Sequence, residues 1–175
     1  MTDRNNSQSR ASAFVHYLFD RCQHDKGFAA RIRRADNPAT EYQSWEALAV
    51  FGVDLENSAE RLSFGMVAAA VARSRFEING ILPLGRAIAL CYDDGNQSDP
   101  AKTRLRRLLA CDNNEELCRV LRPLLTLIQS RIAQPLDYAQ LLSDALWFNR
   151  SQQNVKAHWA QQFYGKQDSM VKESL

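Results

Sequence analysis

Residues 64–72 read Phe-Gly-Met-Val-Ala-Ala-Ala-Val-Ala, inside a helix that the apolar spacing predicts over residues 59–73. A helix that is apolar around nearly its whole circumference must be covered by other elements on all sides. The run is also far shorter than the roughly 18 residues that a membrane-spanning helix needs. The stretch therefore predicts a central, buried helix around which the rest of the chain packs.

The sequence on both sides of this stretch is helical in its apolar spacing, and no run alternates with the period of a strand. We predict helices at about residues 9–23, 26–35, 38–52, 84–91, 100–111 and 114–133, one that starts at 135–137, and a last one that ends at Gly165. The fold is therefore predicted to be all-α, with two small helical bundles joined by a short linker.

The linker is placed at residues 93–98, whose composition is that of a turn. This boundary separates an N-terminal bundle at 10–92 from a C-terminal bundle at 99–165, and the polar ends at 1–9 and 166–175 are predicted to be flexible tails. Within 38–52 we expect four side chains to face inward, and within 114–133 we expect a proline to kink or divide the helix. These residues are Tyr42, Trp45, Leu48 and Ala49, and Pro123.

The chain offers no convergent set of catalytic or metal-binding groups. Its three histidines are isolated, and its four cysteines form no C-x-x-C pair. Asp93 and Asp94 can bind a metal in principle, but adjacent acids in a Gly/Asn loop are usually solvated turn residues. The sequence therefore predicts no enzyme, no metal and no cofactor. The polar first ten residues resemble no signal peptide, so we expect a cytoplasmic protein with reduced thiols and no membrane association.

Basic residues are concentrated on a few predicted helices, although the net charge is only +2. On 26–35 most cations lie opposite the apolar face, and on 100–111 they surround the exposed arc without any acid. Arginine outnumbers lysine in these clusters, and its forked donors suit phosphate oxygens. We therefore predict a nucleic-acid-binding surface, with the helix over 100–111 contributing the larger share of the affinity. Its candidate residues are Arg31, Arg33, Arg34, Arg86, Lys102, Arg104, Arg106, Arg107, Arg119 and Arg122.

Acidic residues are concentrated elsewhere, because the segment from residue 35 to 60 contains no Lys or Arg. We expect its six acids to form a separate acidic surface: Asp36, Glu41, Glu46, Asp54, Glu56 and Glu60. Runs of charge are usually ordinary solvated helix faces. An alternative interpretation is therefore a helical protein-interaction adaptor whose charged faces serve subunit assembly.

Six segments, in their order and spacing, carry a resemblance to a known family. They are ARIRRA (30–35), LGRAIA (84–89), RLRRLLA (104–110), ELCRVLR (116–122), PLDYAQLL (135–142) and WAQQFYG (159–165). Together they resemble CasB, the small subunit of the type I-E CRISPR surveillance complex known as Cascade. The resemblance covers about residues 10–165, and it rests on the ordered set because no single motif is specific.

The resemblance implies an all-helical, non-catalytic subunit present in two head-to-tail copies beside the subunits that carry the CRISPR RNA. It further implies that basic surface residues hold target and displaced DNA strands of the R-loop by their phosphates. The positions that best match the family's basic residues are Arg33, Arg34, Arg104, Arg107 and Arg122. Pro123 stands where some members carry a further basic residue, and Arg119 is expected to replace that contact.

Overall fold

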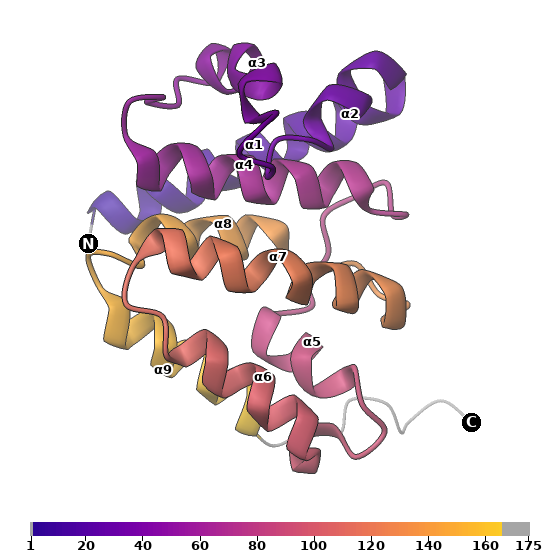
Figure 1. The fold of residues 1–175 in the computed structure, drawn as a ribbon, viewed down its shortest axis with the longest axis vertical. Coiled ribbons are helices and arrows are strands. Elements are labelled where there is room, and N and C mark those ends of the chain that lie inside the picture. Colours follow the sequence, from indigo (N-terminus) through magenta and orange to yellow (C-terminus); the bar gives the residue numbers. More distant parts are fainter. Residues whose placement is uncertain (1, 166–175) are drawn as a thin grey trace.

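The computed structural model describes residues 2–165, with side chains from residue 3 onward. All named elements in this range are helices, which confirms the all-α prediction (Figure 1). They are α1 (Thr2–His24), α2 (Lys26–Ile32), η1 (Glu41–Ser44), α3 (Trp45–Val50), α4 (Ser58–Arg73), α5 (Leu84–Leu90), η2 (Gly95–Gln97), α6 (Asp99–Leu109), α7 (Asn114–Arg131), α8 (Tyr138–Trp147) and α9 (Gln152–Tyr164).

Helix α4 is the centre of the fold, as its apolar sequence predicts. Every residue from Ser63 to Ala72 is buried, and α4 packs on α1, α2, α7 and α8. In Figure 1 α4 runs between α2 and α3 on one side and α7 and α8 on the other. A Cβ atom at Gly65 would lie 2.9 Å from the carbonyl oxygen of Ala35, so the glycine allows the chain after α2 to approach closely.

The core is shared across the predicted linker at residues 93–98. Helix α1 packs extensively on α8, α5 packs on α9 and α6, and the buried apolar side chains form one cluster. A Cβ atom at Gly85 of α5 would lie 2.2 Å from the carbonyl oxygen of Trp159, which shows how closely α5 and α9 approach. Separate bundles at 10–92 and 99–165 stay a prediction, but the two parts pack against each other.

The N-terminal expectations require two corrections. Residues 2–9, predicted to be a flexible tail, form the first turns of α1, while the predicted tail at 166–175 lies outside the described residues. The helix predicted over 38–52 is replaced by turns, η1 and the short α3. The Asn37 side chain accepts a hydrogen bond from the Ala39 amide at 3.0 Å, and Thr40 Oγ1 donates to the Arg34 carbonyl at 3.1 Å. Such local side-chain bonds compete with helical ones.

The same correction changes which side chains of this segment are buried. Of the four residues expected to face inward, only Leu48 is buried. Trp45 and Ala49 are exposed, and Tyr42 is 60% exposed. Beside Leu48, Ala47 and Phe51 pack against the core as partly buried residues, so the inward face of this segment differs from the one that the helical spacing predicts.

The C-terminal helices follow the sequence pattern closely. Apolar residues at helical spacing along α7, and on to Ile132, are buried throughout, and so are those of α8 and α9. They are Leu117, Leu121, Leu124, Ile128 and Ile132, then Tyr138, Leu141, Leu142, Ala145 and Phe148, and last Val155, Trp159 and Phe163. Pro123 does not divide α7, which runs without interruption from Asn114 to Arg131. Pro123 is exposed, so its ring lies on the solvent side of α7, where it removes one backbone hydrogen bond and crowds the carbonyl oxygen of Arg119 without ending the helix.

A buried carboxylate lies where α8 meets α9. Asp144 accepts hydrogen bonds from Trp159 Nε1 at 3.0 Å and from Gln140 Nε2 at 2.9 Å. Burial raises the pKa of Asp144, although these hydrogen bonds and nearby positive groups oppose the shift. The unfolded chain then binds fewer protons than the folded one. This group therefore lowers the stability as pH rises from its unfolded pKa toward its folded pKa.

We expect Asp144→Asn to keep the bond from Trp159 through its amide oxygen and to remove this pH dependence. The free energy of unfolding of the variant, relative to that of the original protein, should therefore increase as pH rises above about 4, the usual aspartate pKa. Urea unfolding of both proteins at several pH values measures the difference. A difference that is constant with pH would contradict the assignment.

Candidate nucleic-acid interface

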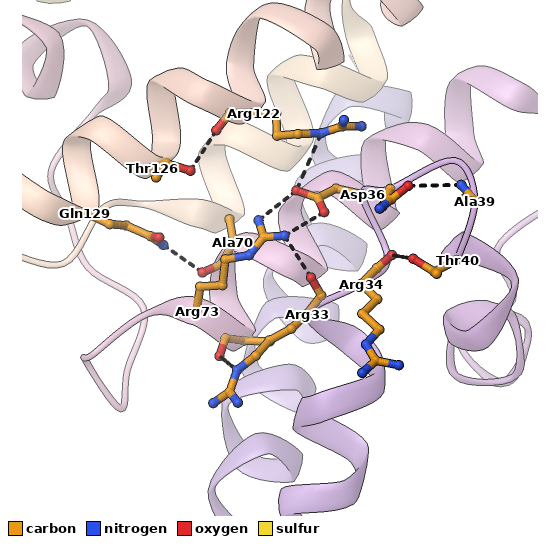
Figure 2. A network of polar contacts seen from close by, with 12 residues as sticks. Arg33, Arg34, Asp36, Ala39, Thr40, Ala70, Arg73, Arg122, Thr126 and Gln129 are labelled. Carbon is orange, nitrogen blue, oxygen red and sulfur yellow. Dashed lines mark hydrogen bonds and ion pairs between the residues drawn. The ribbon is translucent and has the colours of Figure 1, made fainter.

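Asp36 lies after the end of α2 and joins three elements through arginine side chains (Figure 2). Its carboxylate accepts two hydrogen bonds from Arg73 of α4, both at 2.7 Å. Arg73 also donates to the carbonyl oxygen of Arg33 at 2.8 Å. Nε of Arg122, on α7, lies 3.7 Å from the same carboxylate. We call these four residues (Arg33, Asp36, Arg73 and Arg122) the Asp36 cluster.

The Asp36 cluster is positively charged overall, since it contains three arginines and one carboxylate, of which Arg73 and Arg122 lie against the carboxylate. The hydrogen bonds from Arg73 to Asp36 raise the pKa of that guanidinium. Nε of Arg33 donates to the Ala72 carbonyl at 3.0 Å, while its terminal nitrogens make no hydrogen bond to the part of the chain that is described. Asp36 was expected on an acidic surface, but its side chain is only 5% exposed. The Asp36 carboxylate therefore interacts mainly with Arg73 and Arg122 and adds little negative charge to the surface.

A second basic region lies on α6, which begins with Ser98 as N-cap and Pro100 in its first turn. Leu105 and Leu108 are fully buried and fix one side of the helix to the core. On the other side are Lys102, which is half-buried, and Arg106 and Arg107, which are exposed. No acid within residues 3–165 lies within ion-pair distance of these three cations, which we call the α6 face.

Arg104 differs from its neighbours and corrects the expectation that it projects freely. It is half-buried, and its Nε donates to the hydroxyl of Tyr92 at 2.7 Å. This contact ties α6 to the loop after α5. The Arg104 side chain is therefore held in place by a structural contact.

The predicted residues do not form one continuous site. Helices α2 and α6 lie toward opposite ends of the molecule in Figure 1, with α4 and α7 between them. Arg34 is exposed beside the Asp36 cluster and contacts Gln43 Oε1 at 3.4 Å. Arg31 instead lines a groove between α1, α2 and α3, and Arg86 is half-buried on α5. Arg119 is paired with Glu115 at 3.1 Å, one turn away on α7.

Arg73 belongs to the Asp36 cluster but is absent from the candidate residues that the sequence predicts. It ends the central helix α4, where a cation is usual because it favours the negative helix C-terminus. That position gives no indication of a binding role. The contact with Asp36 links residues 37 positions apart, so only the packing of α4 against the end of α2 reveals it.

The predicted acidic surface is partly neutralised in the folded protein. Glu60 pairs with Arg10 of α1 at 2.6 Å, and Glu41 pairs with Arg61 of α4 at 3.6 Å. With Asp36 buried as well, three of the six acids remain exposed without an ion pair to the described residues. These are Glu46, Asp54 and Glu56.

Other reactive groups do not gather into a site within residues 2–165. No group of three or more His, Cys, Asp or Glu in this range is placed to hold a metal ion, and the three histidines are exposed. Three cysteines are buried, and burial raises the pKa of the Cys118 thiol to about 12. None of the helices described is both long and apolar enough to cross a membrane.

Comparison with known proteins identifies the family. The family described as CRISPR-associated protein Cse2 matches residues 29–164, which include the Asp36 cluster and the α6 face. No curated protein sequence gives a significant match.

Solved structures agree with this family assignment. CasB from M. ruber is 32% identical, with 89% of this chain and 92% of that chain covered and a TM-score of 0.72. CasB from Thermobifida fusca shares the fold at 19% identity and a TM-score of 0.71, covering 90% of this chain and 97% of that one. A chain of a CRISPR RNA-guided surveillance complex does so at 22% identity and a TM-score of 0.70, covering 90% and 92%. The protein therefore belongs to the Cse2 (CasB) family of CRISPR-associated proteins.

Proposed function

We propose that this protein is the small subunit of a CRISPR Cascade surveillance complex, where it holds the guide RNA and target DNA strands of the R-loop through their phosphates. Two findings support its assignment as a Cascade subunit. The chain belongs to the Cse2 family, and it shares its fold with a chain of a surveillance complex. The observation that carries the binding role is the α6 face, where Lys102, Arg106 and Arg107 have no acidic partner among the described residues. Cations without internal partners are free to meet phosphates.

The mechanism requires only charge and shape. Base pairing between guide and target carries the sequence information, and strand exchange is close to energetically balanced. A subunit that contacts a few phosphates can therefore favour the open form, because each contact releases counterions from the nucleic acid. We propose that the protein acts without catalysis, beside other Cascade subunits and a second copy of itself, in the cytoplasm, where its thiols would stay reduced.

Base stacking contributes little in this proposal. Trp159 and Phe163 are buried in the core, and Trp147 is half-buried. Trp45 is 36% exposed, but the Arg61 guanidinium lies over its ring, 5.9 Å from the ring centroid. Proteins that bind single strands by stacking need aromatic faces along a basic groove. In this proposal, phosphate contacts from arginine and lysine therefore supply most of the binding free energy.

We expect the full-length protein to bind a fluorescent single-stranded oligonucleotide weakly and with little sequence preference. The logarithm of the association constant should fall with the logarithm of salt concentration by about 0.7 for each phosphate contacted. Fluorescence anisotropy at several salt concentrations, with oligonucleotides of different sequence, measures both properties. A flat salt dependence or a strong preference for one sequence would contradict the proposal.

One observation favours the alternative role of an interaction adaptor. Tyr42 is 60% exposed and Val50 75% exposed on and beside α3, next to Glu46, and such side chains suit contact with another protein. The two roles are separated by the binding assay, since an adaptor would not bind single strands at moderate salt.

A further inference from the structure

Asp36 is an acid in the middle of a basic cluster, where a negative charge works against phosphate binding. A solvent-exposed acid there would weaken binding, but this side chain is 5% exposed. Both of its oxygens are directed at arginines from helices that are distant in sequence, Arg73 of α4 and Arg122 of α7 (Figure 2). The position and burial of this carboxylate therefore need a physical explanation other than surface charge.

Arg73 retains donors beyond those that hold it in place. A guanidinium carries five N–H groups. Two of them are used on Asp36, and a third goes to the carbonyl of Arg33. The Nε–H and one Nη1–H therefore remain without an acceptor among the described residues, each on its own edge of the guanidinium, and the side chain is 36% exposed. A phosphate oxygen is an acceptor of the kind that arginine favours.

Arg122 depends on Asp36 in a different way. Its Nε is buried and makes no hydrogen bond among the described residues, and at 3.7 Å from the carboxylate its attraction is electrostatic. Its terminal nitrogens also make no hydrogen bond within residues 3–165, although the side chain is 41% exposed. The carboxylate of Asp36 is thus the nearest partner of a guanidinium that is otherwise free to bind.

We infer that Asp36 is a positioning residue, which holds Arg73 and Arg122 in place as a preformed binding site for a phosphate diester. The inference rests on the proposed function and assigns Arg73, absent from the sequence-predicted set, to the interface. Without the carboxylate, two guanidiniums from different helices would repel each other. With it, they stay together, and the cluster of Arg33, Arg73, Arg122 and Asp36 keeps an excess positive charge for the ligand.

Holding the arginine side chains in place before the ligand binds increases the affinity. A long side chain that is free in solution loses rotamer freedom when it binds, and this loss reduces the affinity. Arg73 has already lost that freedom on folding, because it is held by three hydrogen bonds. The negative charge of Asp36 costs some affinity, but its burial and its two arginine partners limit the repulsion that a phosphate experiences.

The test compares Asp36→Asn with Asp93→Asn in the full-length chain. Both changes remove one negative charge, and Asp93 is exposed in the turn before η2. If only net charge mattered, both variants would bind a fluorescent oligothymidylate more tightly. We expect Asp36→Asn to bind about fivefold more weakly, and Asp93→Asn to bind equally or slightly more tightly. A folded Asp36→Asn variant that binds as tightly as the original protein, or more tightly, would overturn the inference.

A double-mutant cycle with Arg122→Gln tests whether the affinity lost in Asp36→Asn depends on Arg122. The effect of Asp36→Asn should be smaller in the Arg122→Gln background, because one of the two positioned side chains is already gone. Effects that simply add would count against positioning.

A variant that keeps the charge provides the test if Asp36→Asn fails to fold. Arg122→Lys removes the Nε that faces Asp36 but keeps the cation, so we expect about threefold weaker binding at an unchanged melting temperature. Unchanged affinity would overturn the inference.

If the original protein itself does not bind single strands at low salt, the proposed function fails. If it binds but Asp36→Asn and Arg122→Lys have no effect, only the positioning role fails.

Discussion

Reversing the charge of Arg106 and Arg107 together should weaken the binding of single-stranded DNA on the order of 30-fold while leaving the protein folded. Both side chains are exposed on α6, whose opposite side is fixed in the core by Leu105 and Leu108. No acid of the described chain neutralises them, so each substitution removes a phosphate contact and adds a repulsive charge. Both arginines lie in the last turn of α6, where cations favour the helix C-terminus, so the two reversals should together cost about 1–2 kcal/mol of stability.

The matched control reverses Arg4 and Arg150, which are also exposed and give the same change in net charge. Anisotropy titrations at several salt concentrations, with melting temperatures for each variant, separate a local effect from a general one. We expect the control to lose only a small part of the affinity and to keep the salt slope of the original protein. Equal losses in both double variants would show that only the net charge matters. The α6 face would then not be a binding surface.

Trp159→Ala should lower the free energy of unfolding by about 3–5 kcal/mol, the range for removing a large buried aromatic side chain. Trp159 is fully buried, stacks on Phe148 at 6.1 Å between ring centroids, and donates to Asp144. The substitution leaves a cavity between α8 and α9 and removes one of the few partners of a buried carboxylate. Stability is a difference between large terms, so this loss is a substantial fraction of the total for a domain of this size.

Urea unfolding followed by circular dichroism measures this loss. Trp45→Ala is the control, since Trp45 is 36% exposed on the short α3 and its removal should cost far less. A loss for Trp159→Ala that is no larger than that of the control would show that α9 is not held to the core through this side chain. DNA binding by the folded fraction should be unaffected, because Trp159 stacks on Phe148 and donates to Asp144, which both lie outside the two basic regions.

The core of this protein could be predicted from local patterns with few errors. Apolar residues at helical spacing identify the buried faces of α7, α8 and α9, and the central α4 follows from an apolar run of residues 64–72. The pattern failed between residues 38 and 52, where Asn37 and Thr40 form side-chain bonds to the backbone that a periodicity count does not register. Tyr42 and Trp45 were assigned to the core because the spacing, taken alone, is compatible with a helix.

The basic helices could also be predicted, since charge and amphipathic spacing are both local properties. The sequence alone placed Arg106 and Arg107 on the exposed side of α6, and the structure agrees. It could not show that Arg104 is tied to Tyr92 or that Arg119 is paired with Glu115. Whether a cation is free depends on which partner lies within a few ångströms, and spacing along one helix gives only part of that information.

The sequence by itself therefore determined the helical class, most of the buried faces and the two basic helices. Only the tertiary structure decided that Asp36 is buried between Arg73 and Arg122, and that α2 and α6 lie far apart. Helical periodicity acts over three or four residues, so it fixes which side of each helix is apolar. The Asp36 cluster joins positions separated by 37 and more residues, and its geometry arises only when α4 and α7 pack beside the end of α2.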